Sequence, residues 1–472
     1  MSQFRIEHDL LGDRQVPDEV YYGVHTLRAK ENFHITGTPI STYPELINAL
    51  ALVKQAAAQA NFKLGLLEQD KHDAIVAACQ AVQTGKCHEH FVVDMIQGGA
   101  GTSTNMNANE VICNLALEHM GHKRGEYQYL HPNEDVNMAQ STNDVYPTAL
   151  HLAAYRSLDP LFASMERLRD AFLKKSEEFS SYMKIGRTQL QDAVPMTLGQ
   201  ELNAFATMIN EDIVRLKESR KLMCDVNLGG TAIGTGITAH PDYAELAVAA
   251  LSELSGVPLR VSADLIEATQ DCGGFLHLSG VLKRAAVKLS KLSNDLRLLS
   301  SGPRAGMGEI CLPAVQAGSS IMPGKVNPVI PEVVNQVAFE VIGADMTVTM
   351  AAEAGQLQLN AFEPVIIHSL LRSMALLSNA CDTLTQFCVV GITANRECLE
   401  SNIERSISLV TALNPFIGYK AATSVAAEAF QTGTNIRDVV LKRGLMDAET
   451  LNEVLRAESL IQPRDLRAAD PA

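Results

Sequence analysis

The chain has 472 residues, of which 46% are hydrophobic and 20% are charged, a balance typical of globular proteins with large cores. The formal net charge is −15 and no block of Lys or Arg stands out, so nucleic acid and anionic membrane surfaces are poor candidate partners. No apolar run reaches the roughly 18 residues of a membrane span, the polar start of the chain resembles no signal peptide, and nine Cys occur without paired spacing. We therefore expect a cytoplasmic protein with reduced, buried thiols.

Short helices and loops are predicted for the first region, residues 1–141. Its segment Tyr21–Ala29 (YYGVHTLRA) contains Arg28, which is either a bidentate clamp for a carboxylate or a surface charge, and residue type alone favours the surface charge. Further on, Gly98–Gly101 leads into Thr102 and a helical stretch. The free N–H groups at such a helix start suit an anion, although an ordinary capped helix start is the alternative.

Possible metal ligands occur twice in this region. Residues 87–90 (CHEH) form one group, and His119 with His122 forms the other. Neither group has a zinc-like spacing to a second pair of ligands. The sequence therefore predicts no metal site.

A second polar cluster, Ser141-Thr142-Asn143, precedes a long helix. Each of these residues is a good N-cap. Capping needs only one of them, so two polar side chains remain to be explained.

From Thr148 on, the sequence predicts five long helices, because apolar residues recur every three or four positions. Three of these helices have the seams Leu161, Met165, Leu168 and Phe172; Leu198, Leu202, Phe205, Ile209, Ile213 and Leu216; and Leu278, Leu282, Ala285, Leu289, Leu292, Leu296 and Leu299. The other two helices are expected near 331–354 and 364–388, each with Pro in its first turn. The fold class is therefore mainly α, with a helical bundle and three domains at 1–141, 142–394 and 395–472.

The helix near 333–355 is apolar on nearly every side. Such a helix must be buried on every side. One five-helix bundle cannot bury all of its helices in this way, so we expect bundles to pack against copies of themselves.

Two further segments lie between the bundle helices. Gly186–Thr197 (GRTQLQDAVPMT) joins the first two of them. The second segment, Gly229–Gly236, suggests a nucleotide-binding turn, but no strand precedes it and the third glycine of that fingerprint is missing. We interpret it as a tight turn where helices pack closely.

The most distinctive stretch is Gly318–Pro328 (GSSIMPGKVNP), whose two Gly and two Pro predict a loop. It carries two hydroxyls, one Lys and one Asn without any acidic residue, which is an inventory suited to binding a carboxylate. Its glycines would let it close over a bound anion. On residue types alone, an ordinary connecting loop is an equal alternative.

This loop resembles the signature of the fumarase/aspartase superfamily, whose members remove ammonia, water or an amine from a succinate skeleton to leave fumarate. The similarity extends from about Asp18 to about Arg443, and the segments 21–29 and 413–419 also resemble the family. The resemblance implies a homotetramer with a shared helical core and active sites built from several subunits.

The resemblance also implies roles for ten residues. Ser319 would be the catalytic base. The β-carboxylate of the substrate would be bound by Thr102, Ser141, Thr142 and Ser320. The α-carboxylate would be bound by Thr188, Lys325 and Asn327. The amine would be oriented by Asn143 and Gln189.

Gln189 separates the possible reactions. Fumarases carry a His at this position, and loss of hydroxide needs a proton donor. Gln cannot donate a proton but can orient an amine, which leaves as neutral ammonia with little help. We therefore expect reversible conversion of L-aspartate to fumarate and ammonia, without a required cofactor; activation by a divalent cation such as Mg²⁺ is left open. A class II fumarase, a lyase for a larger succinyl-amine and a non-catalytic helical scaffold are the alternatives.

Overall fold

The computed structural model describes residues 4–463. The chain packs as two compact units. Unit 1 comprises residues 1–163, 212–287 and 338–378, and unit 2 comprises 164–211, 288–337 and 379–472, in each case as far as the chain is described. The predicted domain boundaries at 141 and 394 stay a prediction.

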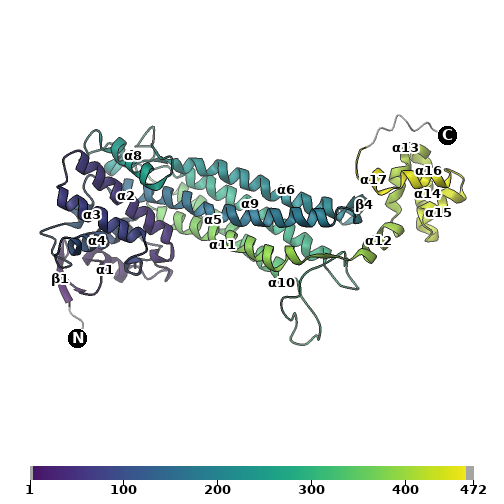
Figure 1. The fold of residues 1–472 in the computed structure, drawn as a ribbon, viewed down its shortest axis with the longest axis horizontal. Helices are drawn as coiled ribbons and strands as arrows, with labels where there is room; N and C mark the ends of the chain where they lie inside the picture. Colours follow the sequence, from purple (N-terminus) through teal and green to yellow (C-terminus); the bar gives the residue numbers. More distant parts are fainter. Residues whose placement is uncertain (1–3, 464–472) are drawn as a thin grey trace. The chain divides into compact units, whose positions relative to one another are not determined.

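Unit 1 begins with a hairpin, followed by four helices that stand together (Figure 1). The hairpin strands are β1 (Phe4–Asp9) and β2 (Gly12–Pro17), which pair antiparallel. The helices are α1 (Val24–Asn32), α2 (Pro44–Lys63), α3 (Gln69–Gln83) and α4 (Thr102–His119). Short helices α7 (Thr231–Gly234) and α8 (Tyr243–Ser255) also belong to this unit.

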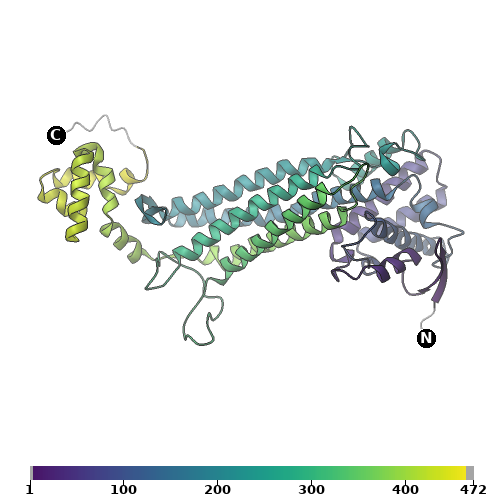
Figure 2. The ribbon, with the colours of Figure 1, turned by 180° about the vertical axis from the view of Figure 1, so that it is seen from behind.

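Five long helices dominate the chain, as predicted, and they are seen from behind in Figure 2. They are α5 (Thr142–Glu178), α6 (Leu198–Arg220), α9 (Gly273–Leu299), α10 (Val329–Glu353) and α11 (Glu363–Phe387). All residues of the three predicted seams are buried. The prediction of a mainly α protein with long bundle helices is therefore confirmed, and the three- and four-residue spacing correctly located the buried faces.

The remaining strands are short. Unit 2 holds the hairpin of β3 (Met183–Thr188) and β4 (Gln191–Thr197), and the antiparallel pair β7 (Ile310–Cys311) and β8 (Thr393–Ala394). Unit 1 holds the parallel pair β5 (Asp225–Val226) and β6 (Arg260–Val261).

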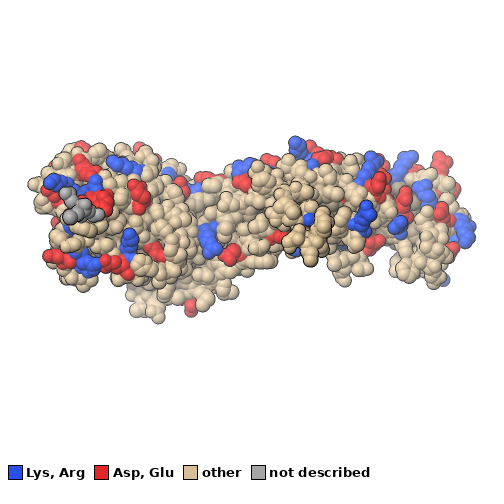
Figure 3. Space-filling view, turned by 90° about the horizontal axis from the view of Figure 1, so that it is seen from below, with Lys and Arg blue, Asp and Glu red and all other residues tan. Residues whose placement is uncertain are grey.

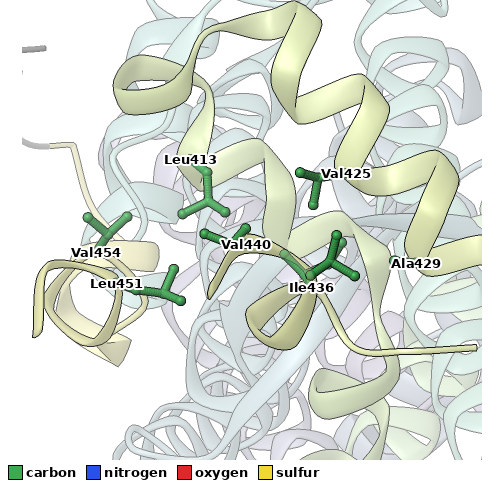
Figure 4. Close-up of a cluster of buried hydrophobic side chains, with 8 residues drawn as sticks. Leu413, Val425, Ala429, Ile436, Val440, Leu451 and Val454 are labelled. Atoms are coloured by element: carbon green, nitrogen blue, oxygen red, sulfur yellow. The ribbon is translucent and has the colours of Figure 1, made fainter. Parts of the chain in front are cut away.

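The C-terminal segment of unit 2 builds a small core of its own. Its helices are α12 (Arg396–Arg405), α13 (Asn414–Ile417), α14 (Tyr419–Thr432), α15 (Ile436–Lys442), α16 (Ala448–Val454) and α17 (Ala457–Leu460). Figure 4 shows the apolar side chains that converge there, among them Leu413, Val425, Val440 and Leu451. From Arg464 on, the tail lies outside the described residues.

Basic and acidic side chains are interspersed on the face seen in Figure 3. Within residues 4–463, no helix is both long and apolar enough to cross a membrane. All nine cysteines are free thiols; seven are buried, whereas Cys311 is exposed and Cys398 is partly exposed, so the expectation of buried thiols is wrong for these two.

Helix α10 is apolar on two sides, but only one of these sides is buried. Ala338, Val341 and Val348 are buried, whereas Phe339, Met346 and Met350 are each more than 60% exposed. Exposure of large apolar side chains along one helix face is typical of a surface that another protein covers.

Candidate active site

The predicted cluster Ser141–Asn143 forms the N-terminal start of α5. Ser141 Oγ accepts a hydrogen bond from Asn143 N at 3.3 Å, and Ser141 N donates to Asp144 Oδ1 at 3.0 Å. This reciprocal pattern is a capping arrangement, and it fixes the backbone from which the three side chains project.

The Thr142 hydroxyl is oriented by its neighbour on α4. Asn105 Nδ2 donates to Thr142 Oγ1 at 3.1 Å and to Asn137 Oδ1 at 3.2 Å. The Thr142 oxygen accepts this bond and its O–H donates to none of residues 4–463, so the O–H is available to a ligand.

A buried lysine lies behind this segment. Lys54, on α2, donates to Asn137 Oδ1 at 2.9 Å and to Gln140 Oε1 at 2.8 Å. Its burial lowers the pKa of the ammonium group to about 7, and the carboxyl group of Asp144 opposes this shift. Lys54 was missed by the sequence analysis, although a single Lys within the apolar run 46–60 is a signal that could have found it.

The glycine-rich turn 229–236 also supports the cluster. Asn143 Nδ2 donates to Ala232 O at 2.7 Å, and the N–H groups of Gly229 and Thr231 donate to Asp144 Oδ2 at 3.1 Å each. Burial raises the pKa of Asp144 to about 7. The interpretation as a tight packing turn is correct, because a Cβ at Gly229 would lie 2.6 Å from Ala244 Cβ. Its contact with Asn143 was not foreseen.

Thr102 begins α4 and is exposed. The preceding Gly101 has a left-handed φ of 88°, and a Cβ there would collide with the ring of Tyr146 on α5. Glycine at this position therefore lets the starts of α4 and α5 meet, which brings Thr102 to the same end of unit 1 as Thr142.

The loop Gly318–Pro328 in unit 2 is closed by its own contacts. Gly318 N donates to Lys325 O at 2.8 Å, and Asn327 Nδ2 donates to Gly318 O at 2.8 Å. Ser319 Oγ accepts hydrogen bonds from Ile321 N at 3.2 Å and Met322 N at 2.8 Å. Two N–H donors aimed at one hydroxyl oxygen would stabilise negative charge on that oxygen. Ser320 and Lys325 are exposed.

Thr188 and Gln189 lie at the exposed tip of the β3–β4 hairpin, also in unit 2. Gln189 and Leu190 have φ values of 53° and 62°, in the left-handed region that costs a non-glycine residue roughly 1–2 kcal/mol. Such strain concentrates at functional sites.

The ten predicted residues thus fall into three groups. Unit 1 brings together Thr102, Ser141, Thr142 and Asn143, and the 318–328 loop brings together Ser319, Ser320, Lys325 and Asn327. Thr188 and Gln189 form the third group. Within the described part of unit 2, no hydrogen bond or ion pair joins the hairpin tip to that loop.

Arg28 is neither exposed nor free for a ligand. It forms a bidentate salt bridge with Asp9, with distances of 2.7 and 2.8 Å, and its side chain is 18% exposed. The interpretation of Arg28 as a surface charge is therefore wrong, because the arginine clamps the β1–β2 hairpin to α1.

The residues considered as metal ligands have other contacts. His88 Nε2 lies 2.8 Å from Val82 O, and the His122 ring stacks on Tyr129. Among residues 4–463, no three His, Cys, Asp or Glu side chains are grouped so that they could hold a metal ion.

Two protein families match parts of the chain. Residues 12–343 match the Lyase family, and residues 409–462 match the fumarase C C-terminus. The aspartate ammonia-lyase of Pseudomonas canavaninivorans is 61% identical over 464 residues, which cover 98% of each chain.

Solved structures agree with the sequence matches. A fumarate lyase:delta crystallin from Brucella melitensis, bound to cobalt, has a TM-score of 0.94 and 55% identity, covering 99% of this chain and 100% of its own. A class II fumarase from Schistosoma mansoni has a TM-score of 0.93 but only 34% identity, covering 98% of this chain and 100% of its own.

Proposed function

We propose that this chain, which belongs to the fumarase/aspartase superfamily, is an ammonia-lyase that converts L-aspartate reversibly to fumarate and ammonia. It is a carbon–nitrogen lyase of a family that works without a cofactor. The observation that carries the proposal is the match to an aspartate ammonia-lyase over 98% of this chain. The identity is 61%, compared with 34% for the class II fumarase.

The chemical difficulty is removal of a weakly acidic proton from the carbon next to the β-carboxylate. The resulting carbanion is accessible only if that carboxylate takes up a second negative charge as an aci-carboxylate. Hydrogen-bond donors already aimed at the group supply the largest stabilisation, about 3 kcal/mol for each donor. Thr102, Ser141, Thr142 and Ser320 are assigned this role, and the free O–H of Thr142 supports it.

Ser319 is assigned as the base, acting as an alkoxide. An isolated serine hydroxyl is far too weakly acidic for this role, so its surroundings must stabilise the anion. The N–H groups of Ile321 and Met322, which both donate to Ser319 Oγ, support the assignment.

The remaining contacts orient the substrate. Thr188, Lys325 and Asn327 are assigned to the α-carboxylate, and Asn143 and Gln189 to the amine. Asn143 Nδ2 is occupied by Ala232 O, so its carbonyl oxygen is the atom left to accept from an ammonium group. Gln189 cannot protonate a leaving hydroxide, which argues against a fumarase.

A homotetramer with sites shared between subunits is part of the proposal. The exposed side chains Phe339, Met346 and Met350 on α10 support it, since a second copy would cover them. The nine free thiols support a reducing compartment such as the cytoplasm. Activation by a divalent cation such as Mg²⁺ is compatible with the chemistry, which needs no metal for any step.

An assay with separate substrates tests the function. We expect fumarate, followed by its ultraviolet absorbance, to appear from L-aspartate and essentially not from L-malate. If the protein hydrates fumarate faster than it aminates it under saturating ammonium, the chain is a fumarase instead.

A further inference from the structure

Four charged side chains form a neutral, largely buried cluster beside the β3–β4 hairpin in unit 2. Lys184 Nζ lies 2.6 Å from Glu201 Oε2 and 2.8 Å from Glu309 Oε2, and Arg187 Nη1 donates to Glu309 Oε1 at 2.6 Å. The Glu309 side chain is fully buried and that of Lys184 is 2% exposed. We refer to these four residues as the Glu309 cluster.

Glu309 is fixed by its backbone as well. Its N–H donates to Leu299 O at the end of α9, and its carbonyl accepts from Asn395 N at the start of α12, each at 2.9 Å. The next residue, Ile310, begins β7, which pairs with β8. Glu309 is therefore a rigid anchor at the point from which the chain runs on to the 318–328 loop.

The other end of the cluster reaches the hairpin tip. Arg187 directly precedes Thr188 and Gln189, and the strand pairing is interrupted by a bulge between Ile185 and Arg187. A bulge re-aims the side chains that follow it. Among residues 4–463, no side-chain hydrogen bond or ion pair holds Thr188 or Gln189 themselves, so the Arg187–Glu309 pair is the nearest side-chain restraint on the β3 side of the tip.

Stability alone does not explain such a cluster. A buried ion pair contributes little more than well-packed apolar residues would, because desolvation offsets the attraction between the charges. An ion pair does fix the orientation of the two side chains that it joins. Here it joins Arg187, on the strand that leads to the hairpin tip, to Glu309.

We propose that Glu309 is a positioning residue for substrate binding, which holds Arg187 and thereby fixes the Thr188–Gln189 tip. The inference rests on the proposed function, in which Thr188 and Gln189 contact the α-carboxylate and the amine of the substrate. Glu309 itself touches neither substrate nor reacting atoms.

The test compares two variants of similar chemistry. Glu309→Gln keeps the size of the side chain and removes its charge, and we expect KM for L-aspartate to rise at least tenfold while kcat falls by a smaller factor. Hydrogen exchange of the amides in 186–192, measured without substrate, should become faster by at least tenfold. Asp382→Asn is the matched control: it weakens the ion pair of Arg167 in the same unit and should leave both readouts within twofold of wild type.

Two further variants keep the test decisive. If Glu309→Gln does not fold, Arg187→Gln carries the same expectation for KM and for exchange, because Lys184 then keeps Glu309 paired. The double variant should have a KM no higher than that of the more impaired single variant, because both single changes break the same Arg187–Glu309 contact. Folded variants with unchanged KM and unchanged exchange at the tip would overturn the inference. Absence of turnover by the wild-type protein would instead count against the proposed function, and hydrogen exchange would still decide whether Glu309 orders the tip.

Discussion

The start of α5 and the 318–328 loop together carry seven of the ten proposed site residues, yet they are held in opposite ways. Ser141–Asn143 is fixed by the buried residues Asn105 and Asp144, and the buried Lys54 holds Gln140, which directly precedes it. The loop is exposed, and the side-chain bonds that order it run between its own residues. Of the donors proposed for the β-carboxylate, Ser141 and Thr142 are thus preorganised, whereas Ser320 and the proposed base Ser319 lie on the exposed loop.

The largest effect is expected at the loop. Ser319→Ala should lower kcat by about 10²–10⁴-fold, the usual contribution of a general base, with little change in unfolding temperature because the Ser319 hydroxyl bonds only within the loop. Fumarate release and thermal unfolding measure the two quantities. Ser459→Ala, in the C-terminal segment, is the control. Residual activity within tenfold of wild type would show that another residue removes the proton.

The second-largest effect is expected on the pH dependence of stability in unit 1, which holds the start of α5. Burial alone raises the pKa of Glu363, the first residue of α11, to about 8 from an ordinary value of 4.5. The folded protein therefore holds this proton where the unfolded chain has lost it, so the contribution of Glu363 to the unfolding free energy falls as pH rises from about 4.5 to 8. Glu363→Gln should reduce that loss by on the order of 4 kcal/mol.

Urea unfolding of wild type and Glu363→Gln at pH 5 and pH 8 measures this difference. Parallel pH dependences of the two proteins would show that Glu363 is ionised in the folded state.

A smaller effect is expected from the buried lysine. Lys54→Met leaves Asn137 Oδ1 and Gln140 Oε1 without their charged donor, which should lower the unfolding free energy by about 2–3 kcal/mol. Because Asn137 accepts from Asn105, which in turn donates to Thr142, kcat/KM for L-aspartate should fall roughly tenfold. Lys63→Met changes an exposed lysine of the same helix and should leave both quantities unchanged. Equal behaviour of the two variants would remove the argument for preorganisation through Lys54.

The sequence predicted the long helices well because leucines at three- and four-residue spacing report directly on a buried helix face. It could not predict contacts between residues far apart in the chain, such as Asn143 with Ala232 or Arg28 with Asp9, because spacing carries no information about them. The left-handed backbone at Gln189 was also beyond reach, since nothing in a Gln-Leu pair signals positive φ.

The site residues were placed by resemblance rather than by composition. Residue types alone left the 318–328 loop open between an ordinary connection and a carboxylate site. The structure adds the two N–H donors on Ser319 Oγ, which no sequence pattern shows.

The most direct test of a site shared between copies mixes two inactive variants. Ser319→Ala alters the loop and Thr188→Ala alters the hairpin tip. After reversible dissociation and reassembly of the mixture, we expect part of the L-aspartate activity to return, because some sites then receive an intact loop from one copy and an intact tip from another. If the mixed oligomers stay inactive although exchange of subunits is demonstrated by mass, both residues serve one site within a single copy and the account of a shared site is contradicted.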